Sequence, residues 1–170
     1  MRNSLGRPSS QHVSTKKEGY KMIQLQDLAK PLPEKWIKEK GTGFAAKYCS
    51  HGDIQQALLA KLGPTSQRIV KEIYNSEGNV LEGVILEMVF HIDLEPVVIQ
   101  EIGESERDTG NNALNLKNSV SDAVKRCAMR VGLGLELWTE NYALDKALAK
   151  RAEEQEDLEL LTSIRELEAE

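Results

Sequence analysis

The sequence has few cysteines, few aromatic residues and no long apolar run. Its two cysteines, Cys49 and Cys127, are far apart and form no CxxC pair, so neither a zinc site nor a disulfide framework is indicated. No stretch of about 18 apolar residues is present, and residues 1–21 lack the apolar segment of a signal peptide. We therefore expect a soluble, cytoplasmic protein that makes no membrane contact.

The motifs of common enzymes are also missing. The sequence contains no GxxxxGK, HExxH or GxSxG, so ATP use, zinc proteolysis and acyl transfer lack their minimal residues. His12, His51 and His91 are far apart in the sequence, and each is more readily structural than catalytic. Gly132 and Gly134 follow a predicted helix rather than opening one, which indicates close packing or helix termination instead of dinucleotide binding. We expect no enzymatic activity, no cofactor and no metal.

Charge is distributed unevenly along the chain. The formal net charge is −5, but residues 151–170 hold eight acidic and two basic residues, a local charge of −6 that leaves +1 for the rest. The net negative charge argues at first sight against binding of nucleic acid, but its distribution removes this objection. A nearly neutral body can carry a basic groove on one face, while an acidic tail keeps clear of DNA or limits its access. The simpler interpretation of the tail is a solvated acidic helix.

Composition divides the chain into three parts. Residues 1–21 are mostly Ser, Gly, Pro, Lys and Gln and predict a flexible leader. Residues 22–140 contain the apolar patterning of one core domain. Residues 141–170 are rich in Ala, Leu, Glu and Lys and predict an acidic tail of one or two helices.

Strand patterns fill the middle of the core domain. They predict strands at residues 66–74, 80–92 and 96–102, with a turn at 75–79. The second strand alternates in a way that buries one face, formed by Val84, Leu86, Met88, Phe90 and Ile92. The three strands are expected to form an antiparallel meander.

Helical patterns surround this meander. A short helix is predicted at residues 23–29, and another within 48–63, with Ser50 as its N-cap and Gly63 at its end. A long helix is predicted at residues 113–131, with an apolar stripe formed by Leu116, Val120, Ala123, Val124, Cys127 and Val131. The fold class is therefore α+β, with the meander packed on the long helix and further helices at its flanks.

The polar side of the long helix carries an arc of cations. Lys117, Lys125, Arg126 and Arg130 share it with a single acidic residue, Asp122. Such arcs are usually solvated faces, and on this pattern alone DNA binding is the less favoured interpretation.

Three segments resemble a known family. The sequence SDAVKRCAMRVGLGLELW, residues 121–138, resembles the helix signature of the RAD fifty-two superfamily of single-strand annealing proteins, particularly its bacterial DdrA-like and phage Sak-like branches. The sequence YCSHGDIQQALLAKLG, residues 48–63, resembles the Tyr-led helix of the same family, and EIGE, residues 101–104, resembles its strand end. Order and spacing agree from about Ile23 to Trp138.

The resemblance implies a β-β-β-α core that assembles into rings or arcs with a basic groove around the outside. It implies that Lys125 and Arg126 face the DNA backbone, and that a third basic contact is Lys38, with Lys40 as the nearby substitute. Eukaryotic members carry a further Arg where this chain has Met129, and Arg130 next to it points about 100° away on a helix.

The expected function is therefore ATP-independent binding of single-stranded DNA and annealing of complementary strands in recombination or repair. The protein would act as a homo-oligomer in the cytoplasm, associated with the nucleoid, or in a host cytoplasm if phage-encoded. A recombinase or single-strand-binding partner does not follow from the sequence. Two alternatives stay open: an oligomeric scaffold that presents its acidic helices, and a DNA-end protector without annealing activity.

Aromatic residues add a smaller expectation. Trp36, Tyr48, Phe90 and Trp138 could stack on bases, as aromatic residues of single-strand binders often do. Core packing is favoured for Phe90 and Trp138, and Tyr48 is open to either interpretation.

Overall fold

The alternating segment around Phe90 forms the central strand, β4 (Leu81–Ile92), in a computed structural model that describes residues 25–39 and 47–168. β4 pairs antiparallel with β3 (Ser66–Tyr74) and with β5 (Glu95–Glu104), giving the order β3-β4-β5. Every second residue of β4 from Val84 to Phe90 is buried. The predicted meander is confirmed, and β5 runs two residues further than expected.

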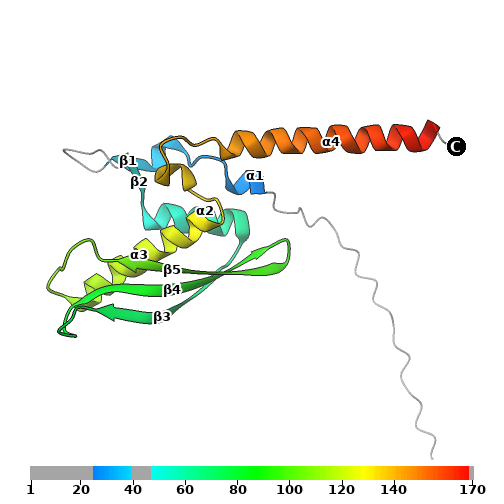
Figure 1. Cartoon of the computed structure of the whole chain (residues 1–170). Helices are drawn as coiled ribbons and strands as arrows, with labels where there is room; N and C mark the ends of the chain where they lie inside the picture. Colours follow the sequence, from blue (N-terminus) through cyan, green and yellow to red (C-terminus); the bar gives the residue numbers. More distant parts are fainter. Residues whose placement is uncertain (1–24, 40–46, 169–170) are drawn as a thin grey trace, which may run out of the picture.

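Helix α3 (Asn112–Arg130) covers the inner face of β4 and β5 (Figure 1). Ala123, Val124 and Cys127 are fully buried, and Leu116 and Val120 pack at the edge of the same core. The predicted apolar stripe is thus confirmed. Strand β3 is not covered by α3, and nearly all of its residues are exposed.

Close approach of β5 to α3 depends on Gly103. A Cβ atom there would lie 2.0 Å from the carbonyl oxygen of Ser119 and 2.7 Å from the Cβ of Ala123. Because no side chain fits this space, glycine lets the end of β5 contact the helix backbone. The next residue, Glu104, is thereby placed beside the polar face of α3.

Helix α2 (His51–Leu62) has the start and end that its sequence predicts. The hydroxyl of Ser50 accepts a hydrogen bond from the backbone N–H of Asp53 at 3.3 Å, and Gly63 ends the helix with a φ of +74°. The buried side of α2 consists of Ile54, Ala57, Leu58 and Leu62.

The segment before α2 forms a small hairpin, where the sequence predicts only a short extended piece at Trp36 and Ile37. Two short helical elements precede this hairpin, α1 (Leu25–Leu28) and the 3-10 turn η1 (Glu34–Trp36). Strands β1 (Ile37–Glu39) and β2 (Lys47–Cys49) then pair antiparallel. Three-residue strands are too short for alternation to identify. The expected leader, residues 1–21, and Lys40 lie outside the described residues.

Two glycines turn the chain sharply after α3. Gly132 and Gly134 have φ values of +96° and +73°, a region that other residues rarely adopt. A Cβ on Gly134 would lie 3.3 Å from Leu32 Cδ1, so the turn also packs closely against the N-terminal segment. The next element is the 3-10 turn η2 (Leu135–Trp138), in which Glu136 accepts a hydrogen bond from the N–H of Leu32 at 2.6 Å.

The acidic segment forms one helix, α4 (Leu144–Glu168), which extends away from the rest of the fold (Figure 1). It is joined to α1 near its start, where the hydroxyl of Tyr142 donates to the carbonyl oxygen of Ala29. Further along the helix its large apolar side chains from Leu158 to Ile164 are exposed, namely Leu158, Leu160, Leu161 and Ile164. No helix within residues 25–39 and 47–168 has the length and apolar character needed to cross a membrane.

Candidate nucleic-acid interface

A groove of about 530 Å³ lies where β2, the end of β5, α3 and η2 meet. Tyr48 reaches it from β2, Lys125 and Arg126 from α3, and Trp138 from η2. The loop between β5 and α3 contributes Arg107. Side chains distant in the sequence are therefore gathered at one surface.

The face that α3 turns toward the groove follows from helical spacing. Asn118, Ser121, Asp122 and Lys125 recur every three or four residues and so lie along one side of the helix. The buried stripe occupies a different side, so this face can hold polar groups without disturbing the core.

Arg126 is the most constrained cation of the groove. Its Nε donates to Asp122 Oδ2 at 2.8 Å, and its Nη2 lies 4.0 Å from Glu104 Oε1. Its guanidinium carbon lies 5.0 Å from the centroid of the Trp138 ring, a cation–π distance. The hydrogen bond to Asp122 raises the pKa of Arg126 further, so the side chain stays charged. About a third of it, 33%, remains exposed.

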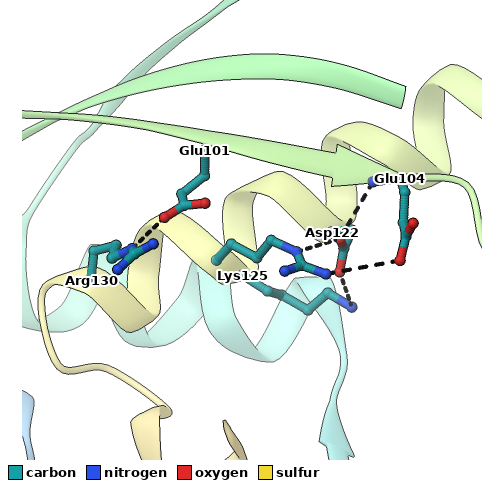
Figure 2. A network of polar contacts seen from close by, with 6 residues as sticks. Glu101, Glu104, Asp122, Lys125 and Arg130 are labelled. Atoms are coloured by element: carbon teal, nitrogen blue, oxygen red, sulfur yellow. Dashed lines mark hydrogen bonds and ion pairs between the residues drawn. The ribbon is translucent and has the colours of Figure 1, made fainter. Parts of the chain in front are cut away.

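Asp122 is shared by Lys125 and Arg126. Lys125 Nζ lies 3.8 Å from Asp122 Oδ1, and the backbone N–H of Glu104 donates to Asp122 Oδ2 at 3.4 Å. Figure 2 shows Asp122 between the end of β5 and the Lys125 side chain. The carboxylate thus ties the end of the sheet to the basic face of the helix.

The groove carries a positive balance in a protein of net charge −5. Four cations line it, Lys47, Arg107, Lys125 and Arg126, against three carboxylates, Glu104, Glu106 and Asp122. Ion pairs at partly exposed positions are worth about 0–1 kcal/mol, so an incoming phosphate can compete with these carboxylates for the cations. The groove can therefore accept a polyanion.

Buried Asn115 holds the loop that forms one wall of the groove. Its Oδ1 accepts from the N–H of Thr109 at 3.0 Å and from the Thr109 hydroxyl at 2.7 Å, while its Nδ2 donates to Asp108 at 3.0 Å. That hydrogen bond, with a second from the N–H of Gly110, lowers the pKa of Asp108. Arg107 directly precedes Asp108 and Thr109, the two loop residues that Asn115 holds.

Of the residues predicted for DNA contact, Tyr48, Lys125 and Arg126 line the groove together. Lys38 lies opposite Tyr48 in the β1–β2 pair, which puts both side chains on the same face of the hairpin.

The remaining predicted residues lie elsewhere. Lys117 is exposed on α3 but does not line the groove, and Arg130 is ion-paired with Glu101 of β5, also outside its lining (Figure 2). Lys40 is outside the described residues.

Among the lining residues with a cationic or aromatic side chain, sequence reasoning missed three. Core packing was expected for Trp138, which is wrong, because 44% of the residue is exposed at the groove. Lys47 and Arg107 belong to no periodic pattern, and only their position beside Tyr48 and in a polar loop hinted at a surface role. Phe90 and Cys127 are buried as expected.

Comparison with protein families and with curated proteins identified no relative of this chain. Neither a scan against protein-family models nor a search of curated proteins returned a match. Within the described part of the chain, no three His, Cys, Asp or Glu side chains gather as a metal site would require. What the fold and site define is a mixed α+β protein with a cationic, aromatic groove.

Proposed function

We propose that the protein binds single-stranded DNA along this groove by its phosphates and, as a homo-oligomer, anneals complementary strands without ATP. The observation that carries the proposal is the gathering of Lys125 and Arg126, the pair that the family resemblance assigns to DNA, with Lys47, Arg107 and Tyr48 in one groove. These cations come from three separate segments of the chain. If the basic face of α3 were only solvated, cations from the other two segments would not need to lie beside it.

Phosphate binding accounts for the charge pattern. Neutralised phosphates release counterions, which supplies affinity that does not depend on base sequence. A grip on the backbone leaves base edges free to pair with a second strand. Annealing breaks no covalent bond, so it needs neither a nucleophile nor a nucleotide cofactor.

Oligomerisation would multiply modest contacts in each subunit through effective concentration. Strand β3 offers a route to assembly, because one of its edges has no partner strand in the described sheet and Ile69 and Val70 are exposed on it. Light scattering should give an oligomer at micromolar concentration. A monomer with and without DNA would contradict this part of the proposal.

The central test is a fluorescence annealing assay with two complementary oligonucleotides. The full chain should accelerate pairing, and the double variant Lys125→Ala with Arg126→Ala should bind single strands more weakly whatever their sequence. Two lost phosphate contacts should flatten the slope of log K against log salt by about 1.4, at about 0.7 for each contact.

A matched control is Lys146→Ala with Lys150→Ala, which removes the same charge from exposed positions on α4. Binding without accelerated pairing would indicate an end protector. A scaffold would instead lose its assembly in the Lys125 and Arg126 variant and keep its salt slope. Unchanged affinity and slope would place the DNA site elsewhere.

A further inference from the structure

Two large aromatic side chains are exposed at the groove. Trp138 is 44% exposed and Tyr48 is 40% exposed, although the chain has only two tryptophans and four tyrosines. Each comes from a different element, η2 and β2, and both lie among cations. Exposed aromatic residues grouped in a concave polar surface are typical of a recognition site.

The indole of Trp138 is held before any ligand binds. The Arg126 guanidinium lies over its ring at 5.0 Å, and Arg126 is itself fixed by Asp122. The neighbouring Leu137 packs against the core, which anchors η2. Little side-chain freedom remains to be lost when another flat group contacts the ring.

Tyr48 is oriented by the small hairpin. Its neighbour Cys49 is buried, and because side chains alternate along a strand, Tyr48 points away from the core. Lys38 lies opposite it on β1. The phenol ring is thus presented beside a cation, as Trp138 is.

We infer that Trp138 and Tyr48 form a stacking site for the bases of single-stranded nucleic acid, with the adjacent cations holding the phosphates. This inference rests on the proposed function and extends it to recognition of bases. Stacking uses the face of a base and leaves its pairing edge accessible, so a stacked strand can still meet its complement. Duplex bases already stack on one another, so the site selects single strands.

The test uses the full chain carrying Trp36→Phe, which leaves Trp138 as the single tryptophan. Two probes of equal length and charge are titrated: an oligothymidylate and an abasic deoxyribose-phosphate oligomer. Oligothymidylate should quench Trp138 fluorescence and bind roughly tenfold or more tightly than the abasic oligomer, because stacking contributes to affinity only when bases are present.

Two substitutions at Trp138 separate stacking from packing. In the otherwise unchanged chain, Trp138→Leu keeps an apolar side chain but no ring, and should weaken oligothymidylate binding by roughly tenfold. Trp138→Phe keeps a ring for both a base and Arg126, and should retain most of the affinity. Affinity for the abasic oligomer should be the same in both variants, and circular dichroism should show both folded.

Each other result has a distinct meaning. If both probes bind equally, with a normal salt slope and no difference in quenching, phosphate binding holds and stacking is wrong. If Trp138→Leu weakens both probes equally, Trp138 acts only by positioning Arg126, which also overturns the stacking site. If neither probe binds at low salt, the proposed function fails and the stacking site fails with it.

Discussion

Arg126 Nε lies 2.8 Å from Oδ2 of Asp122, one helical turn earlier on α3. The same carboxylate approaches Lys125 and accepts a hydrogen bond from the N–H of Glu104. Asp122 therefore has two opposed effects on the proposed DNA site: it orients the cations, and it offsets their charge. Because these groups are partly exposed, the weakening of DNA affinity caused by the negative charge of Asp122 should outweigh any gain from its orientation of the cations.

Replacing Asp122 by Asn tests that balance. The amide retains an oxygen that can accept from the N–H of Glu104, but the groove loses one negative charge. Single-strand affinity at low salt should rise by roughly two- to fivefold, measured by fluorescence anisotropy. Glu156→Gln, the same charge change on exposed α4, is the control and should have little effect. Weaker binding by Asp122→Asn would show that orientation of Arg126 matters more than charge.

Arg107 and Arg130 test whether the groove or the helical arc defines the interface. Arg107 lines the groove, whereas Arg130 is ion-paired with Glu101 outside it. Arg107→Ala should weaken single-strand binding and flatten the salt slope by about 0.7, and Arg130→Ala should do neither. Both variants remove one charge, so net charge alone cannot separate them. The reverse ranking would favour a DNA path along the arc of α3.

The sequence was informative wherever burial imposed a period. β4 alternates because one face meets α3, and α2 and α3 show their apolar stripes for the same reason. The β1–β2 hairpin has no such period, since its strands have three residues each. Trp138 was misassigned because large aromatic residues are usually buried, and only the turn at Gly132 and Gly134 brings it to the groove. Lys125 and Arg126 were found through the family resemblance.

Gly103→Ala should be among the most destabilising small substitutions in the chain. The new methyl would lie 2.0 Å from the Ser119 carbonyl oxygen and 2.5 Å from the backbone nitrogen of Ala123. Relieving the overlap requires β5 and α3 to separate, at a cost of about 1–3 kcal/mol or more. Urea unfolding of the variant and of the unchanged chain measures this difference in the free energy of unfolding. Gly52→Ala is the control: its nearest neighbour would be 4.0 Å away, and alanine favours helix by about 1 kcal/mol. Equal stability of the two variants would contradict the close β5–α3 contact.

Cys127 should give stability a distinct dependence on alkaline pH. Burial raises the pKa of its thiol from 9.0 to about 11. Below pH 9 the thiol is protonated in both the folded and the unfolded chain, so its full contribution to stability is present. Between pH 9 and about 11 the unfolded thiol ionises first, and that contribution is lost.

The measurement is urea unfolding from pH 8 to 11, compared with Cys127→Ala, which lacks this thiol and should lose less stability over the range.

The native thiols should also react slowly with a disulfide reagent at pH 8, because Cys49 and Cys127 are both buried. Rapid reaction of one thiol in the folded chain would contradict this burial.

Truncation after Lys150 tests the acidic part of α4. It removes residues 151–170 and their charge of −6, but keeps the start of the helix and the Tyr142 contact that join it to the body. Because the removed residues are almost all exposed where described, folding should persist. Annealing should remain intact, and single strands should bind more tightly since less negative charge repels them.

Salt separates this electrostatic effect from a structural one. The gain in affinity should shrink as ionic strength rises toward about 1 M, where the Debye length is about 3 Å and exposed charges are screened. A full-length variant with Gln in place of the acidic residues of the segment should reproduce the gain, because it removes the charge and keeps the helix length. Annealing lost by the truncated chain, with assembly preserved and the Gln variant active, would show that the helix itself takes part in pairing the strands.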